Sequence, residues 1–178
     1  MRLENSFEVS TPVHDAWRLL NDVPRVVPCM PGAELVEVID ESSWKAELRV
    51  KLGPIGLQFA TDVRRVEMDE AAGRMVLSAK ARESRGRGSA LATIESTLAA
   101  VNGGTRVDIV TELILQGAVA QYGRGIVADV ASRLTAQFAE CVAAKLVDPR
   151  ASANVVAAPI GGLRLLLAAL LRRLFNRP

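Results

Sequence analysis

The sequence is poor in the residues that build metal sites and proton relays. It contains a single histidine, His14, and two cysteines, Cys29 and Cys141. One histidine excludes a multi-histidine metal site and a two-histidine relay. Neither cysteine belongs to a CxxC or Cys/His motif, so we expect both to be reduced, structural thiols. The sequence therefore predicts no metal site.

No catalytic constellation is found in the sequence either. Five carboxylates fall on the polar phase of alternating segments, where we expect them to face solvent: Glu47, Asp62, Glu95, Asp108 and Glu112. Solvated carboxylates make poor general bases. The stretch GRGIVA (residues 123–128) matches the glycine spacing of dinucleotide-binding turns, but no βαβ unit accompanies it, so it predicts a tight turn into a helix. RGRGS (residues 85–89) predicts a hairpin turn. Because no catalytic constellation is found, we expect the protein not to be an enzyme.

The first ten residues, MRLENSFEVS, contain acids and no apolar run. They indicate neither a signal peptide nor a transit peptide, so a cytoplasmic location is expected. A nucleic-acid-binding protein would need a basic body, but residues 1–149 carry 17 basic and 20 acidic side chains. We therefore expect no nucleic-acid partner.

Hydrophobic periodicity predicts one domain over residues 1–147 and an amphipathic helix over 163–176. Between them, residues 148–162 are rich in Ala, Pro, Ser and Gly, which predicts a flexible linker. The domain pattern is one strand, two helical segments, six strands and a long helix over residues 124–146. Thr11 is the expected N-cap of the first helix, and three prolines interrupt the second helical segment. The fold class is therefore α+β, with a curved antiparallel sheet around the long C-terminal helix.

The predicted interior is short of bulky side chains, because the chain has only seven aromatic residues and its strands use many small ones. The small residues are Ala60, Ala79, Ala81, Ala90, Ala92 and Ser96. An apolar cavity between sheet and helix is the favoured expectation, and a collapsed core is the alternative. The residues expected to bind a ligand are Trp17, Leu48, Val50, Phe59, Leu77, Ile109, Leu113, Tyr122, Ile126 and Val130. Tyr122 is alternatively a surface or boundary tyrosine.

The segment GLRLLLAALLRRLF (residues 162–175) predicts a helix with an apolar arc opposite a basic face. The arc contains Leu163, Leu166, Leu167, Leu170, Leu171 and Leu174, with Phe175 at its edge, and the basic face contains Arg164, Arg172 and Arg173. Such a helix is about 20 Å long, too short for a hydrocarbon core of about 30 Å. We expect it to lie in the membrane interface; packing on the domain and docking on a partner protein are the alternatives.

Three separated motifs resemble the CoxG family of carbon monoxide dehydrogenase subunits: AWRLLNDVPRVVPCMPG (16–32), KLGPIG (51–56) and GAVAQYGRG (117–125). The resemblance covers about residues 1–146. It implies a START-like, helix-grip fold of the SRPBCC superfamily, with seven strands around a C-terminal helix and an apolar cavity. The matching positions resemble scaffold and pocket-mouth residues: Trp17, Cys29, Pro31, Gly32, Gly53, Pro54, Gly117, Gln121, Gly123 and Arg124.

The same resemblance implies a partner and a ligand. Members are linked to molybdenum-containing carbon monoxide dehydrogenases and related hydroxylases, to membrane attachment of the enzyme, and in some cases to menaquinone binding. We therefore expect a protein on the inner face of the cell membrane that contacts inner-leaflet lipids. It would hold no covalent cofactor and would carry menaquinone, another prenyl quinone or a lipid. A ligand-free adaptor and a small-molecule enzyme on the same fold are the alternatives.

Overall fold

A computed structural model describes residues 1–52 and 55–148 of the chain. The predicted linker beyond residue 148 and the predicted tail helix, with all its leucine and arginine positions, lie outside the described residues. Gly53 and Pro54 of the KLGPIG motif also lie outside them.

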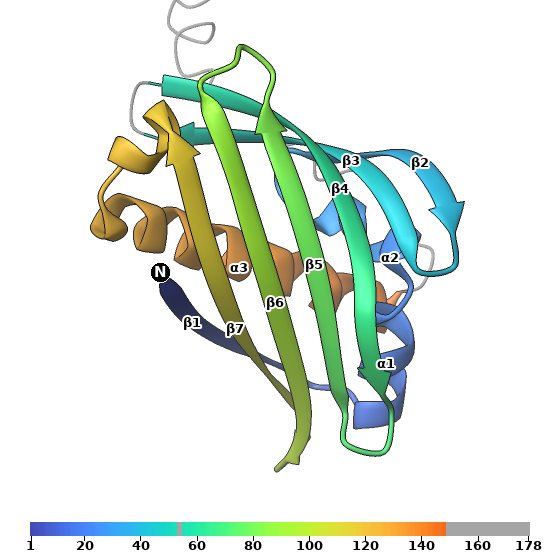
Figure 1. Ribbon diagram of the computed structural model, residues 1–178. Coiled ribbons are helices and arrows are strands. Elements are labelled where there is room, and N and C mark those ends of the chain that lie inside the picture. The colour runs from blue at the N-terminus through green and yellow to red at the C-terminus, as the bar shows by residue number, and fades with distance from the viewer. Residues whose placement is uncertain (53–54, 149–178) are drawn as a thin grey trace, which may run out of the picture.

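The described chain forms one seven-stranded antiparallel sheet and one long helix, with short helices between the first two strands (Figure 1). The strands are β1 (Arg2–Val9), β2 (Ala33–Asp40), β3 (Ser43–Leu52), β4 (Ile55–Asp69), β5 (Arg74–Glu83), β6 (Gly88–Val101) and β7 (Gly104–Gly117). The helices are α1 (Val13–Leu20), α2 (Val23–Val26), the 3-10 turns η1 (Val27–Cys29) and η2 (Ala118–Gln121), and α3 (Arg124–Val147). The predicted α+β class and the sheet around a C-terminal helix are confirmed.

The strand order is β1-β7-β6-β5-β4-β3-β2, so the chain runs as a meander from β2 to β7 and β1 closes the sheet beside β7. Figure 1 shows the strands curving across the front while α3 crosses behind them, with β1 next to α3 and with α1 and α2 behind β4. Register shifts in β2 and between Arg65 and Glu67 of β4 add local bending, because bulged strands bend and twist more strongly. The sheet therefore has a concave face directed at α3.

Packing between helices and sheet fills one end of this concave space. Trp17 and Leu20 of α1 are buried in a cluster with Leu98, Val107 and Val142. At its edge Phe7 meets Phe138 edge to face, with ring centroids 6.0 Å apart. A second, smaller cluster of Leu57, Phe59 and Val119 lies elsewhere on the sheet. The core is thus divided into two clusters, and the space between sheet and α3 is not filled by either.

The start of α1 differs from the prediction. The N-cap is Pro12 and makes no side-chain capping bond, whereas the backbone carbonyl of Thr11 accepts a hydrogen bond from Thr105 Oγ1 at 2.6 Å. The loop before β2 requires a glycine, because Gly32 has φ +78° and a Cβ there would lie 2.1 Å from the backbone oxygen of Arg49. This close approach fixes the position of the proline-rich segment on β3.

The two cysteines are not the reduced thiols that the sequence predicted. Cys29 at the end of η1 and Cys141 in α3 form a disulfide, although 112 residues separate them in the chain. The fold brings them together because α2 and η1 pack on the C-terminal half of α3, where Lys145 Nζ also donates to the backbone oxygen of Arg25 at 2.7 Å.

None of the described helices is long and apolar enough to cross a membrane.

Candidate ligand-binding cavity

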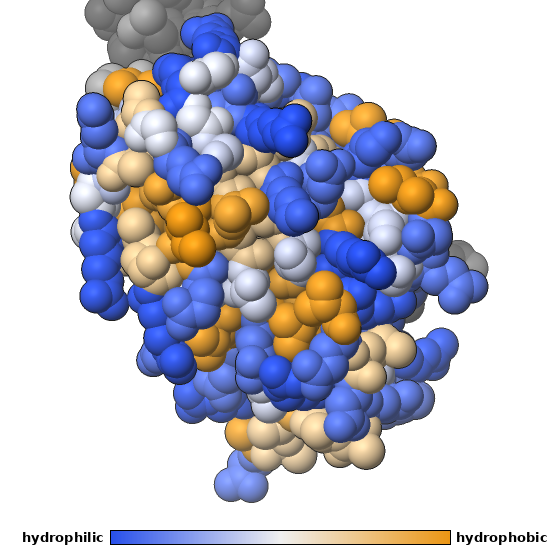
Figure 2. Space-filling view, viewed as in Figure 1, coloured by the Kyte–Doolittle hydropathy of each residue, from blue (hydrophilic) through white to orange (hydrophobic). Residues whose placement is uncertain are grey.

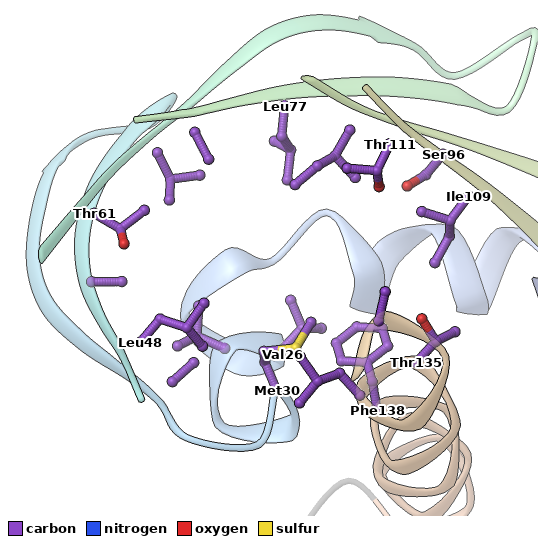
Figure 3. A pocket seen from close by; sticks show the side chains of 18 of the residues that line it. Val26, Met30, Leu48, Thr61, Leu77, Ser96, Ile109, Thr111, Thr135 and Phe138 are labelled. Carbon is purple, nitrogen blue, oxygen red and sulfur yellow. The ribbon is translucent and has the colours of Figure 1, made fainter. Parts of the chain in front are cut away.

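A cavity of about 480 Å³ lies between the concave face of the sheet and α3 (Figure 3). All seven strands contribute to its wall, together with α1, α2, η1 and α3. Its volume falls within the range of ligand pockets, roughly 300–1,000 Å³. The favoured sequence expectation, a cavity rather than a collapsed core, therefore agrees with the structure.

Two regular patterns build the wall. On β3 the alternate residues Trp44, Ala46, Leu48 and Val50 all line it, as expected for one face of a strand. On α3 the lining side chains recur every three or four residues, which is one face of a helix; they are Val127, Val130, Ala131, Leu134, Thr135 and Phe138. Sheet and helix thus present matching apolar faces to the same space.

Most of the predicted ligand-binding residues lie on this wall: Trp17, Leu48, Val50, Phe59, Leu77, Ile109, Leu113 and Val130. Their contact with a ligand stays a prediction. Tyr122 and Ile126 do not line the cavity. Tyr122 packs against the cluster of Leu57, Phe59 and Val119, and Ile126 is 48% exposed because it lies one residue, about 100° of helical rotation, away from the inward Val127.

The sequence patterns did not identify the parts of the wall that come from β1 and from the proline-rich segment of α2 and η1. Alternation in β1 could have identified Leu3, Asn5 and Phe7, since residues two apart share a face. No periodicity marks Val26 and Met30, because prolines interrupt their segment. Figure 3 shows Val26 and Met30 at the base of the cavity beside Phe138 of α3.

Small residues make the space, as the sequence suggested, although not all of those named there contribute. The wall includes Ala79, Ala81, Ala90 and Ser96. Ala92 lies in register with the wall residues Ala79 and Leu113 but does not itself line the cavity. Ala60 is exposed on the outer face of β4.

Few polar groups face the cavity, and those of the described wall are mostly uncharged: Asn5, Asn21, Thr61, Ser96, Thr111 and Thr135. The carboxylate in the wall, Glu47, is 37% exposed and accepts from Gln58 Nε2 at 2.9 Å and from an Arg49 guanidinium nitrogen at 3.3 Å. The hydroxyl oxygen of Thr61 is buried and has no hydrogen-bond partner. The cavity is therefore apolar, with isolated neutral hydrogen-bonding groups.

The strongly perturbed ionisable groups lie outside the cavity wall. The Arg87 guanidinium and two backbone N–H groups hold the pKa of Glu83 down to about 2 against the opposing effect of burial. Hydrogen bonds to Glu95 and Glu67 raise the pKa of Arg74, and the backbone N–H of Ser42 lowers the pKa of Asp40. Within the described residues no group of three His, Cys, Asp or Glu side chains is arranged to hold a metal ion. Glu83, Arg74 and Asp40, whose pKa values are clearly shifted, thus lie away from the described cavity wall.

Comparison with known proteins identifies the architecture. Residues 6–147 match the model of the CoxG family, described as a subunit of carbon monoxide dehydrogenase. No curated protein is significantly similar to the chain in sequence. A conserved protein from Geobacillus kaustophilus has a similar crystal structure, with a TM-score of 0.73 at 20% identity over 83% of this chain and 95% of that one.

Two further solved structures share the fold at lower similarity. The Zhui aromatase/cyclase from Streptomyces sp. R1128 gives a TM-score of 0.59 at 12% identity, covering 83% of this chain and 93% of that one. The protein TTHA0849 from Thermus thermophilus gives a TM-score of 0.58 at 14% identity, covering 81% of this chain and 98% of that one. At such identities these likenesses establish the helix-grip fold alone.

Proposed function

This chain belongs to the CoxG family of carbon monoxide dehydrogenase subunits, and from that premise we propose that it carries a hydrophobic ligand for a carbon monoxide dehydrogenase-type enzyme. The ligand class is a lipid or prenyl quinone, with menaquinone as the leading candidate. The enzyme would be a molybdenum-containing hydroxylase. The observation that carries the proposal is the apolar cavity of about 480 Å³ between sheet and helix.

The physical argument is one of transfer between a membrane and a protein in water. A prenyl chain is nearly insoluble, and each methylene buried in an apolar environment contributes about 0.8 kcal/mol. A pocket of several hundred Å³ suits a drug-sized molecule, so the cavity would enclose the quinone ring and the beginning of its chain. The apolar wall formed by strands and α3 provides such an environment.

We propose a binding role rather than catalysis. The polar groups on the described wall are hydroxyls and amides, apart from Glu47, which is paired with Arg49. Catalytic acids and bases in such pockets are usually recognised by perturbed pKa values, and the perturbed groups of the described chain lie elsewhere. The alternatives are a small-molecule enzyme, since an aromatase/cyclase shares the fold, and an adaptor that attaches the enzyme to the membrane without a ligand.

The proposal is tested by extracting the purified protein with organic solvent and identifying the extracted molecules by mass spectrometry. We expect a prenyl quinone or another neutral lipid in near-stoichiometric amount. Ala79→Phe, which places a ring in the cavity, should reduce the recovered ligand several-fold. The matched control Ala60→Phe, on the outer face of β4, should retain it.

Recovery of no lipid from the wild-type protein would favour the ligand-free adaptor. Equal recovery from Ala79→Phe and wild type would place the ligand outside the cavity. Both outcomes contradict carriage in the space between sheet and α3.

A further inference from the structure

Three hydroxyl groups of the cavity wall are accessible and unpaired. They belong to Ser96 of β6, Thr111 of β7 and Thr135 of α3, all of which are partly exposed. None of the side-chain hydrogen bonds of the described residues involves these hydroxyls. The unpaired polar side-chain atoms that neighbouring atoms cover are different ones: Asn21 Oδ1, Thr61 Oγ1 and Arg87 Nε. A molecule in the cavity can therefore reach the oxygens of Ser96, Thr111 and Thr135.

The three hydroxyls lie in the same part of the cavity. Ser96 is opposite Ile109 of β7 in the sheet register, and Thr111 is two residues further along the same face of that strand. Such diagonal neighbours are about 7–8 Å apart, so one ring can contact both. Figure 3 shows their oxygens directed into the cavity and Thr135 across from them on α3. Asn5 of β1 is also in register with Ile109 and adds an amide to this part of the wall.

The other end of the cavity offers a ligand mainly apolar side chains. In Figure 3 Leu48 of β3 lies at this end, far from Ser96 and Thr111. The wall residues of β3 and β4 are apolar apart from Glu47 and Thr61. Glu47 is paired with Arg49 and Gln58, and the oxygen of Thr61 is covered. The described wall thus has a polar end between β6, β7 and α3 and an apolar end along β3 and β4.

The chemistry of the polar end restricts what can bind there. A ligand group that displaces water from a hydroxyl has to reproduce its hydrogen bond or lose affinity, which favours ligands that carry oxygen atoms. The described wall contains no lysine or arginine. A carboxylate or phosphate would therefore be an unpaired charge in an apolar space, which is strongly unfavourable. Neutral carbonyl oxygens can accept hydrogen bonds from serine and threonine hydroxyls at no such cost.

From these observations we infer that Ser96, Thr111 and Thr135 bind a neutral headgroup of the ligand by donating hydrogen bonds to its carbonyl oxygens. The inference rests on the proposed function and extends it. The headgroup lies between β6, β7 and α3, and the apolar remainder of the ligand extends along β3 and β4. The cavity then selects ketones and quinones over fatty acids and phosphate-bearing lipids.

The test compares three probes that share a naphthalene skeleton. Menadione is a neutral quinone, 2-methylnaphthalene lacks carbonyls, and 2-naphthoate is charged. Calorimetry uses the full-length protein after a hydrophobic resin has removed any lipid that purifies with it. We expect menadione to bind most tightly and 2-naphthoate most weakly.

Variants of the three residues measure the contribution of each hydroxyl. Thr111→Val and Thr135→Val keep the side-chain shape, and each should weaken menadione binding about fivefold while 2-methylnaphthalene stays within about twofold of wild type. The Ser96→Ala/Thr111→Val double variant should lose roughly tenfold or more. The matched control is Thr61→Val, which removes a covered hydroxyl from the same wall and should leave menadione binding within about twofold.

Infrared spectroscopy reports the hydrogen bonds directly and separates them from a merely structural role. A hydrogen bond weakens the C=O bond, so the carbonyl stretch of menadione bound to wild type should lie at lower frequency than in an apolar solvent. In the double variant it should return towards the apolar value. If the double variant does not fold, the Thr111→Val and Thr135→Val proteins carry the same measurement.

The outcomes distinguish the inference from the proposed function. Menadione affinities of Thr111→Val and Thr135→Val equal to that of wild type would overturn the inference and leave carriage intact. Tighter binding of 2-naphthoate than of menadione would do the same, and so would an equal loss of affinity in the Thr61→Val control. Failure of wild type to bind both neutral probes would overturn the proposed function and the inference together.

Discussion

Glu83 has a fully buried side chain, which is uncommon for a carboxylate. It accepts hydrogen bonds from the backbone N–H groups of Arg85 and Arg87 and from the Arg87 guanidinium, at 2.8 to 3.1 Å. Arg87 also donates to the backbone oxygen of Gly56 at 2.8 Å. The pair therefore ties the β5–β6 turn to the beginning of β4.

We predict that this pair controls stability in acid. Because the folded-state pKa of Glu83 is lowered to about 2, its stabilising contribution is complete above the unfolded pKa of roughly 4.3. It is lost as pH falls from there towards 2. Glu83→Gln should melt at a lower temperature than wild type at pH 7, since an amide leaves Arg87 without a counter-ion, and this difference should shrink as the pH approaches 2.

Thermal melts at pH 7 and at several values below pH 4.5 measure the effect. Glu112→Gln is the control, because Glu112 is 58% exposed and lies 3.9 Å from Arg2 on the surface, where ion pairs contribute little. Identical melting curves for Glu83→Gln and wild type at pH 7 would contradict the role assigned to Glu83.

At the scale of elements, the disulfide joins the proline-rich segment to α3. Cys29 ends η1, and Val26, Val27 and Met30 near it line the cavity. Cys141 lies in α3, whose inward residues up to Phe138 form the adjacent part of the wall. The bond therefore fixes one part of the cavity wall to another. Disulfides are rare in reducing cytosol, so the redox state of this pair also tests the cytoplasmic location that the sequence predicts.

Reduction of this bond should destabilise the protein by about 2–4 kcal/mol, because a cross-link between distant residues restricts the unfolded chain. Urea unfolding with and without reductant measures the change. The Cys29→Ala/Cys141→Ala double variant should unfold like the reduced protein and should not respond to reductant. Since the chain has two cysteines, protein purified without reductant should show no free thiol; finding two would contradict the bond.

Element-scale patterns explain which features the sequence could predict. Strict alternation from Trp44 to Val50 predicted a strand with one inward face, and that face lines the cavity. Helical spacing after Arg124 predicted the start of α3 correctly. Local patterns do not encode pairing across 112 residues, so the Cys29–Cys141 bond could not be predicted. The wall contributed by α2 and η1 was missed for a similar reason, because prolines remove periodicity and only packing on α3 places those residues.

At the scale of the whole molecule, charge is unevenly distributed along the chain. Residues 1–149 carry 17 basic and 20 acidic side chains, whereas residues 150–178 carry five arginines and no acid. Figure 2 shows hydrophilic side chains over much of the convex face of the sheet, interrupted by apolar patches. An anionic leaflet would repel the acidic excess of residues 1–149, so we expect electrostatic attraction to the membrane to come from the basic C-terminal segment.

We therefore predict that deleting residues 149–178 abolishes sedimentation with anionic lipid vesicles while recovery of the extracted ligand persists, because the described part of the cavity wall is formed by residues 3–138. Replacing Arg164, Arg172 and Arg173 with glutamine keeps the leucines and should weaken vesicle binding. The loss of binding should be smaller at high salt, because screening by salt already weakens vesicle binding by the wild-type protein. Unchanged sedimentation of the truncated protein would refute membrane anchoring by this segment. Sedimentation that requires the partner enzyme would instead assign the segment to protein docking, and the ligand would then have to be loaded without direct attachment of the carrier to the bilayer.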